Sequence, residues 1–160
     1  MASYRVGDCG RAGLRLCNEM KISIPSLSVN EGLARAVVAA FCVQADPSAT
    51  ELADIKCAVS EAVTNCIVHA YRDTVGEIGL RIRLFEESVI QIEIKDRGCG
   101  IEDIQKAREP LFTTDAEGER SGMGFTVMEN FCDGLRITSR PGKGTSVTLT
   151  KRLHQRTRFT

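Results

Sequence analysis

Two short stretches with closely spaced glycines carry the strongest chemical signal in this chain. Residues 96–101 read Asp-Arg-Gly-Cys-Gly-Ile, and residues 120–125 read Arg-Ser-Gly-Met-Gly-Phe. Glycine lets a backbone approach a ligand more closely than any residue with a Cβ atom allows. A third glycine turn follows at 142–145, and Glu61 and Asn65 stand four residues apart upstream. Together these features predict an ATP site.

Glu61 and Asn65 share one face of a predicted helix. At about 100° per residue they lie within roughly 40° of one another and nearly opposite the apolar stripe. A solvated face is the simpler interpretation of an isolated pair of this kind. However, Cys57, Ala58 and Val68 share the same face, and small or apolar residues there indicate that something covers it. The amide oxygen can bind Mg²⁺ and the carboxylate can accept a proton in phosphoryl transfer.

The other elements also have plain structural interpretations. Residues 96–101 alone fit a strand-to-helix turn, and residues 142–145 alone fit an ordinary hairpin turn. The functional interpretation needs Asp96 because the adenine amino group donates a hydrogen bond. A helix that begins near Gly122 and Gly124 would direct unpaired N–H groups at a phosphate.

Composition narrows the protein class. A chain of 160 residues fits one domain with a single core. Its 21 basic and 21 acidic residues give no net charge, so no overall field attracts nucleic acid or an acidic membrane. A partner must therefore be recognised locally.

Cysteine usage and hydropathy predict a cytoplasmic protein. The seven cysteines are Cys9, Cys17, Cys42, Cys57, Cys66, Cys99 and Cys132. Their number is odd and they form no C-x-x-C pair, which favours reduced, buried thiols over a disulfide framework. The sequence shows neither a signal-peptide core nor an apolar run long enough to span a bilayer, so we expect a protein that is not exported.

Periodicity predicts the order strand, helix, helix, strand, strand, lid, helix, strand, strand. The predicted segments are a strand at 20–24, helices at 30–44 and 48–71, strands at 80–84 and 90–94, a short helical segment to 108, a lid at 110–121, a helix at 124–132 and a closing hairpin across 141–144. Asn30 is the expected cap of the first helix, with Leu33, Val37, Ala40 and Phe41 on its buried face. Ser48 and Glu51 form an expected capping box for the second helix.

This order predicts an α+β fold of two layers, with a mostly antiparallel sheet and the helices on one face. We expect a flexible arm at 1–19, one domain at 20–153 and a basic tail at 154–160. The P-loop sequence is absent, and the glycine pairs do not sit in a βαβ unit. The sequence therefore disfavours a P-loop protein and lacks the usual setting of a dinucleotide-binding fingerprint.

Several stretches resemble a known superfamily. Residues 60–65, 96–101 and 121–125 are similar to the successive boxes of the ATPases and kinases that include gyrase, Hsp90, MutL and histidine kinases. A narrower resemblance covers roughly 20–153: Asn30-Glu31-x-x-Ala34-Arg35, Pro110-Leu111-Phe112-Thr113-Thr114 and residues 119–131 closely resemble the anti-sigma F factors of spore-forming bacteria, which are serine kinases. The general stress anti-sigma kinases are the next most similar group.

The resemblance implies the Bergerat-type ATP-binding fold, with ATP and Mg²⁺ as cofactors. It places Asn65 on the metal, Asp96 on the adenine amino group, Gly98 and Gly100 beneath the base, Thr145 near the base, and Arg120, Gly122 and Gly124 on the phosphates. Thr113, Thr114 and Met123 belong to the same nucleotide-binding set.

The resemblance also implies roles toward proteins. Glu61 would act as the base toward a serine hydroxyl of an anti-anti-sigma protein, and Arg35 would contact partners. Members of this family are cytoplasmic homodimers that hold a sporulation sigma factor away from RNA polymerase.

Three alternatives remain open. A histidine kinase fragment would need a phosphoacceptor helix pair, which no segment supplies. An ATPase of the gyrase and Hsp90 kind would need a longer chain. A binding module with a decayed nucleotide site is the third, although all of the expected polar residues are present.

Overall fold

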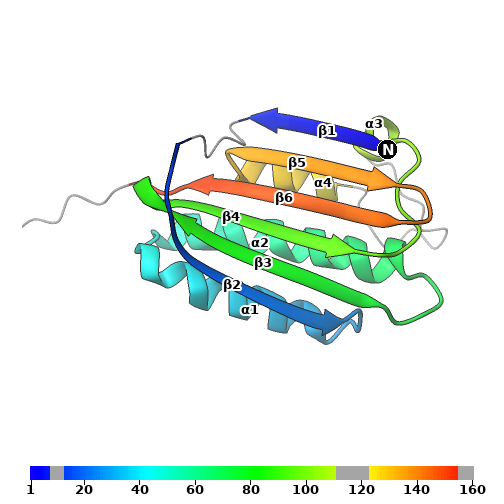
Figure 1. The fold of residues 1–160 in the computed structure, drawn as a ribbon, viewed down its shortest axis with the longest axis horizontal. Helices are drawn as coiled ribbons and strands as arrows, with labels where there is room; N and C mark the ends of the chain where they lie inside the picture. The colour runs from blue at the N-terminus through cyan, green and yellow to red at the C-terminus, as the bar shows by residue number, and fades with distance from the viewer. Residues whose placement is uncertain (8–12, 111–122, 155–160) are drawn as a thin grey trace, which may run out of the picture.

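The computed structural model describes residues 1–7, 13–110 and 123–154, and it forms two layers (Figure 1). The strands are β1 (Ala2–Gly7), β2 (Leu16–Pro25), β3 (Glu77–Phe85), β4 (Val89–Asp96), β5 (Gly134–Arg140) and β6 (Gly144–Arg152). The helices are α1 (Asn30–Cys42), α2 (Ala49–Asn65), α3 (Ile104–Ala107) and α4 (Gly124–Phe131), with short turns of helix at Val43–Ala45, Cys66–Ala70 and Glu86–Ser88. The six strands form one sheet in the order β1-β5-β6-β4-β3-β2.

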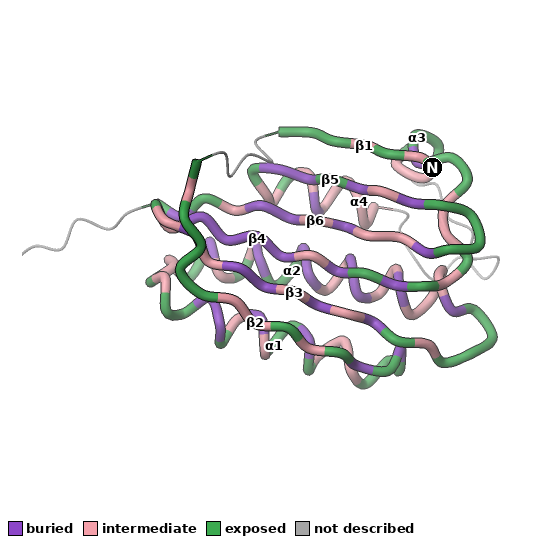
Figure 2. Tube along the Cα trace, in the orientation of Figure 1, coloured by how far each residue is buried: buried purple, intermediate pink, exposed green. Residues whose placement is uncertain are grey.

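Every pairing in this sheet is antiparallel, and α1, α2 and α4 lie on one of its faces. This arrangement confirms the predicted fold class. Alternate strand residues fill the core: Ile82 pairs with Ile92, and Leu135 pairs with Leu149, all of them buried. Figure 2 shows this as alternating buried and exposed segments along the strands. The two predicted hairpins, β3–β4 and β5–β6, are therefore confirmed.

Helix α2 begins with the predicted capping box. Ser48 Oγ accepts a hydrogen bond from Glu51 N at 3.1 Å, and Ser48 N donates to Glu51 Oε2 at 2.9 Å. The carboxylate also accepts from His154 N at 2.8 Å, which fixes the end of the described chain against this helix. Burial by itself would raise the pKa of Glu51, but the hydrogen bonds from His154 and Ser48 hold it at about 2.

The predicted buried face of α1 was right at Phe41 but wrong at Leu33 and Ala40. Ala34, Val38, Phe41 and Cys42 are its buried residues, whereas Leu33 is 50% exposed. Ala40 is exposed as well. Asn30 lies inside the helix rather than at its cap, and its side chain donates to Pro25 O at 2.9 Å. Helix α1 packs against α2 and against the sheet, and these contacts determine which of its faces is buried.

The expected irregular arm at 1–19 is also corrected, because its first residues form a strand. Strand β1 pairs along its length with β5, and β2 begins at Leu16 rather than at Met20. Ala2 and Tyr4 pack against the core, while Ser3 and Arg5 are exposed. This alternation is short and ends at a glycine, so the sequence alone did not indicate a strand. The strand forms because its main chain pairs with that of β5.

Tyr4 connects β1 to the helices on either side of residues 111–122, which lie outside the described part of the chain. The guanidinium of Arg108, directly after α3, stacks on the Tyr4 ring at 3.4 Å from its centroid. The same guanidinium forms an ion pair with Glu129 of α4 at 2.7 Å. Burial, together with the charge of Glu129, raises the pKa of Tyr4. The N-terminal strand thus contacts both α3 and α4.

The cysteines only partly match the expected buried set. Cys42 and Cys66 are buried, whereas Cys17, Cys57 and Cys99 are exposed, and Cys9 lies outside the described residues. Burial raises the pKa of Cys42 to about 12, so its thiol stays protonated. Within the described residues, no helix combines the length and apolar character that crossing a membrane requires.

Replacing Tyr4 by Ala should destabilise the protein. The substitution removes a stacked guanidinium contact and buried ring area, and we expect a loss of about 1 kcal/mol, which corresponds to a fall of roughly 2–4 °C in Tm. Thermal unfolding followed by circular dichroism measures this shift. Ser3→Ala, on the exposed side of the same strand, is the matched control and should leave Tm unchanged. Equal Tm values for both variants would show that β1 contributes nothing through Tyr4.

Candidate functional site

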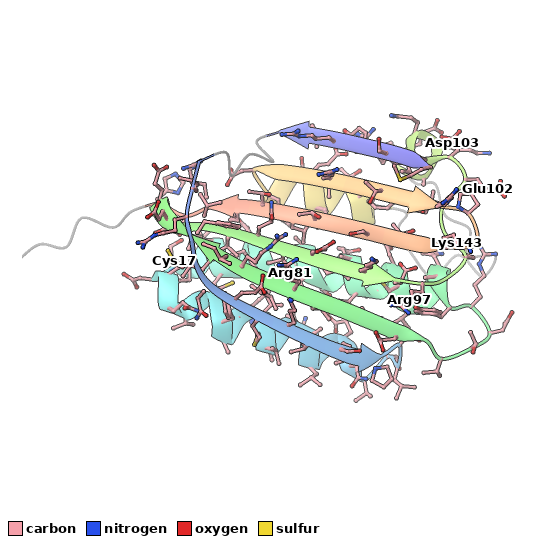
Figure 3. All side chains as sticks on the ribbon, in the orientation of Figure 1. Cys17, Arg81, Arg97, Glu102, Asp103 and Lys143 are labelled. Atoms are coloured by element: carbon pink, nitrogen blue, oxygen red, sulfur yellow. The ribbon has the colours of Figure 1, made fainter. Side chains whose placement is uncertain are left out.

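The predicted site residues of the described chain gather in two adjacent clusters between the helices and one end of the sheet. One cluster surrounds Asp96 at the end of β4, and the other surrounds Glu61 and Asn65 on α2. Figure 3 shows Arg97, Glu102 and Lys143 at this same end of the sheet. Cys66 joins the clusters, because it directly follows Asn65 and its Sγ lies 3.6 Å from Asp96 Oδ2.

Asp96 is a buried carboxylate held by backbone donors. Only 4% of the residue is exposed. Its Oδ1 accepts hydrogen bonds from Gly98 N at 2.9 Å and from Thr145 N at 3.2 Å. Burial raises the pKa of Asp96, and these hydrogen bonds oppose that rise without cancelling it. Oδ1 takes both backbone bonds, and among the described residues the weak thiol donor of Cys66 is the only one that reaches Oδ2. Oδ2 can therefore accept from a further donor.

The glycines after Asp96 are required by the protein's own backbone. A Cβ atom on Gly98 would lie 2.3 Å from Ala70 O, and one on Gly100, where φ is +73°, would lie 2.3 Å from Arg140 O. The same holds for Gly144, whose Cβ would lie 2.1 Å from Asp96 O. These contacts bring β4, the β5–β6 turn and the end of α2 together, and they hold without any ligand.

The end of α2 is adapted to this loop. After Asn65 the helix widens into a π-helical turn, Cys66–Ala70, a feature that occurs often at functional sites. The turn presents Ala70 O to Cys99 N at 3.1 Å. Ala70 therefore contributes to this site through its carbonyl oxygen.

Ser139 of β5 is a site residue that the sequence analysis missed. It is 2% exposed, and its Oγ accepts a hydrogen bond from Ile101 N at 2.8 Å and lies 2.7 Å from Thr145 Oγ1. It therefore fixes the loop after Asp96 to the β5–β6 hairpin and engages the Thr145 hydroxyl. Cys66 was also missed as a neighbour of Asp96, although its position directly after Asn65 was a signal for it.

Helix α4 covers the face of α2 that carries Glu61 and Asn65. A Cβ atom on Gly124 would lie 3.1 Å from Glu61 Oε2 and 3.5 Å from Asn65 Oδ1, so the two half-buried side chains meet the first turn of α4. This explains the small and apolar neighbours on that face, where Ala58 is fully buried, although Cys57 is exposed. Met123 occupies the N-cap and offers no oxygen from its side chain, which leaves first-turn N–H groups for an anion.

Four predicted positions cannot be placed relative to these clusters. Thr113, Thr114, Arg120 and Gly122 lie outside the described residues, as does the lid at 110–121 apart from Pro110. Arg35 lies elsewhere, on the exposed side of α1, where it forms an ion pair with Glu31 at 3.7 Å. The described residues thus bring Glu61, Asn65 and Gly124 together, and Asp96 with Thr145.

Comparison with known proteins finds related sequences over most of the chain. The sequence profile described as histidine kinase-like ATPase domain matches residues 24–151. The anti-sigma F factor of Caldanaerobacter subterraneus subsp. tengcongensis is 56% identical over 134 residues, which cover 84% of this chain and 93% of that protein. The anti-sigma F factor of Bacillus subtilis is 50% identical over 137 residues, covering 85% and 93% respectively.

Solved structures show the same fold. The RsbU and RsbW domains of Rv1364c from Mycobacterium tuberculosis align with a TM-score of 0.65 over 90% of this chain at 23% identity, and this chain spans 35% of that one. A blue-light activated histidine kinase from Erythrobacter litoralis aligns with a TM-score of 0.52 at 26% identity, over 68% of this chain and 32% of the other. The first likeness concerns the fold alone.

Replacing Asp96 by Asn should weaken ATP binding. In this variant the amide oxygen would keep the hydrogen bonds from Gly98 N and Thr145 N. The amide NH₂ would then replace Oδ2, and because it is itself a donor it could not accept a hydrogen bond from the adenine amino group. We expect a loss on the order of 1–3 kcal/mol in binding free energy. Calorimetric titration with ATP measures it.

Asp103→Asn is the matched control, because Asp103 is an exposed residue that caps α3, is not one of the predicted site residues, and undergoes the same change in charge. It should bind ATP normally. Burial raises the pKa of Asp96, so on acidification this carboxylate gains its proton before an ordinary aspartate would. The ATP affinity of the wild type should therefore begin to fall while the pH is still above the usual aspartate range. If Asp96→Asn binds ATP like the wild type, residues 96–101 are only a turn.

Proposed function

The chain belongs to the histidine kinase-like ATPase domain family and is a homologue of anti-sigma F factors, and from this we propose that it restrains a sporulation sigma factor and phosphorylates a serine of an anti-anti-sigma protein. The observation that carries the kinase part is the meeting of Glu61, Asn65 and the start of α4. A base, a metal ligand and an anion-binding helix end converge there, as phosphoryl transfer requires.

We assign the nucleotide base to the Asp96 cluster. The Oδ2 atom of Asp96 has acceptor capacity for the adenine amino group, and Thr145, whose N–H already binds Asp96, would lie beside the base. The internal contacts of Gly98 and Gly100 keep side chains out of the loop, so its backbone would form the wall beneath the base. A buried polar acceptor of this kind rejects bases that cannot donate to it.

We assign the phosphates and Mg²⁺ to the second cluster. The amide oxygen of Asn65 would bind Mg²⁺, and Gly124 with Met123 would bring backbone N–H groups to the phosphates. Arg120, Gly122, Thr113 and Thr114, outside the described residues, are proposed for the same phosphate end. Bound Mg²⁺ would neutralise charge on the phosphate oxygens during transfer.

Glu61 would act as the general base for phosphoryl transfer. In the proposed reaction the serine hydroxyl of the anti-anti-sigma protein attacks the terminal phosphorus of ATP, its proton passes to the Glu61 carboxylate, and the bond to the ADP oxygen breaks. The products are ADP and phosphoserine. Glu61 is half-buried beside Gly124, at the first turn of α4 where the phosphates are proposed to bind.

We place partner binding on α1. The Arg35 side chain is 45% exposed, with one weak pairing to Glu31. Large apolar side chains are exposed around the start of this helix: Leu27 at 44%, Val29 at 76% and Leu33 at 50%. Exposed apolar groups next to an arginine are typical of protein interfaces. They support a contact with the sigma factor, the anti-anti-sigma protein or the second copy of a homodimer in the cytoplasm.

One experiment tests the proposed activity directly. The purified protein is incubated with γ-labelled ATP, Mg²⁺ and a candidate anti-anti-sigma protein, and phosphoserine is sought by mass spectrometry. Label on a serine of that partner is expected. Tight ATP binding without any transfer would instead favour a nucleotide-dependent binding module.

Glu61 and Asn65 should respond differently to substitution. Glu61→Gln keeps the size of the side chain and should leave ATP binding nearly intact while slowing transfer on the order of 10²-fold or more. Asn65→Ala should abolish Mg²⁺-dependent nucleotide binding. Binding and single-turnover transfer, measured in parallel, separate the two effects. Transfer by Glu61→Gln at the wild-type rate would eliminate Glu61 as the base.

Arg35→Ala should weaken partner binding without changing ATP affinity. A central interface arginine commonly accounts for on the order of 2 kcal/mol, so we expect a more than tenfold loss in affinity for the sigma factor. Lys56→Ala, an exposed basic residue on α2, is the control. Titration calorimetry with the sigma factor measures both, and equal affinities would place the interface away from α1.

A further inference from the structure

The face of the sheet that the helices leave open is strongly basic. Alternation along β4 directs Ile92 toward the helices, so Gln91 and Glu93 point to the open face. The same alternation and register give the basic members of this face: Arg5, Lys21, Arg81, Arg83, Lys95, Arg136, Arg140 and Arg152. The acidic members are Glu19, Glu77 and Glu93. Because the whole chain is neutral, charge is segregated onto this face.

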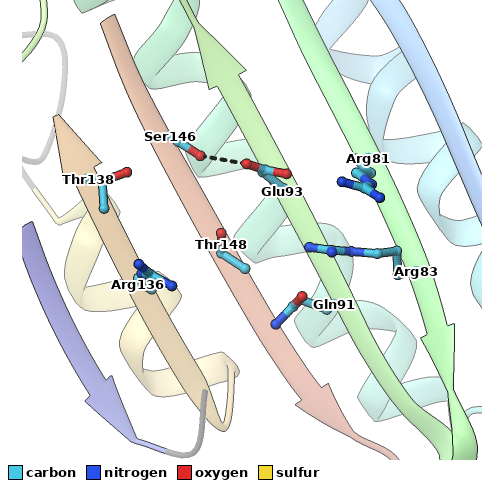
Figure 4. A pocket seen from close by; sticks show the side chains of 8 residues that line it. All are labelled: Arg81, Arg83, Gln91, Glu93, Arg136, Thr138, Ser146 and Thr148. Carbon is cyan, nitrogen blue, oxygen red and sulfur yellow. Dashed lines mark hydrogen bonds between the residues drawn. The ribbon is translucent and has the colours of Figure 1, made fainter. Parts of the chain in front are cut away.

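A polar hollow of about 360 Å³ lies in the middle of the open face (Figure 4). Its lining consists of Arg81, Arg83, Gln91, Glu93, Arg136, Thr138, Ser146 and Thr148. These side chains come from β3, β4, β6 and β5, and none of them is aliphatic or aromatic. An occupant must therefore be polar, and the surrounding charge selects an anionic one.

Two of the three acidic side chains of this face, Glu19 and Glu93, already have partners. Glu19 binds Arg81 at 2.7 Å and Lys21 at 3.5 Å, and Glu93 accepts a hydrogen bond from Ser146 at 3.0 Å. Among the described residues, by contrast, no carboxylate lies within ion-pair distance of Arg136, Lys95 or Arg5. Positive charge thus remains on the β5 side of the hollow.

We propose that this face binds an acidic segment of a protein partner, with carboxylates seated against Arg136 and the hollow. Guanidinium groups pair with carboxylates through two parallel hydrogen bonds, so Asp and Glu side chains of a partner are suitable ligands for these arginines. Nucleic acid fits less well, since Glu19, Glu77 and Glu93 interrupt the basic surface. The one aromatic ring directed to this face in the described strands, Phe85, is buried at 3% exposure and offers no platform for a base.

This surface is separate from the proposed nucleotide site. Asp96 and the α2 cluster lie on the helix side of the sheet, and Arg136 lies on the opposite side. A partner on the open face could bind while ATP is bound. It would be a second docking surface, distinct from the one proposed on α1.

A fluorescein-labelled octaglutamate peptide tests the proposal. We expect binding to the full chain that is detectable by fluorescence anisotropy at low ionic strength and is weakened by salt. Arg136→Glu should reduce affinity at least tenfold. Thr148→Glu, which places a carboxylate inside the hollow, should reduce it by a smaller factor. In ¹⁵N spectra, the peptide should shift amide signals of β5 and β6 more than those of α1 and α2.

Lys56→Glu is the control, because it changes the net charge as much as Arg136→Glu does but lies on α2. It should change peptide affinity less than twofold. ATP affinity measured for all variants shows that each is folded and keeps this test independent of the kinase proposal. The proposal is overturned if the peptide does not bind, if Lys56→Glu and Arg136→Glu weaken it equally, or if an oligothymidylate of equal charge binds the same residues more tightly.

Discussion

A carboxylate that is 4% exposed needs hydrogen-bond donors, and Asp96 obtains them from segments that are distant in sequence. Gly98 N comes from the following loop and Thr145 N from β6, while Cys66 Sγ approaches from the end of α2. Satisfying this group therefore holds three elements at fixed positions. The glycines at 98, 100 and 144 let those elements approach closely enough to do so.

The glycines of this site have a dual significance. Their contacts with Ala70, Arg140 and Asp96 belong to the protein itself and would be needed even in a protein that binds no nucleotide. In the proposed kinase, the same contacts would prearrange the wall of the base site before ATP arrives. A site that is arranged in advance loses less conformational entropy on binding.

Charge is arranged by face rather than by overall balance. The chain has equal numbers of acidic and basic residues, yet the open sheet face has a basic surplus and α1 displays an arginine among exposed apolar side chains. Separate surfaces of this kind can bind different partners, because specificity depends on local complementarity. Arg108 stacks on Tyr4 and forms an ion pair with Glu129. It thereby connects the N-terminal strand to α4, whose first turn contacts Glu61.

Local sequence signals determined the layers, the two hairpins, the capping box at Ser48 and the pairing of Glu61 with Asn65 on one helix face. These features depend on periodicity and on contacts between near neighbours, which a single sequence records. Tertiary structure alone decided that residues 2–7 pair with β5, that α1 buries Ala34 rather than Leu33, and that Ser139 joins Thr145 to the loop at Ile101. Each of these depends on which distant segment supplies a hydrogen bond or fills a space, and such partners leave no periodic trace in the chain.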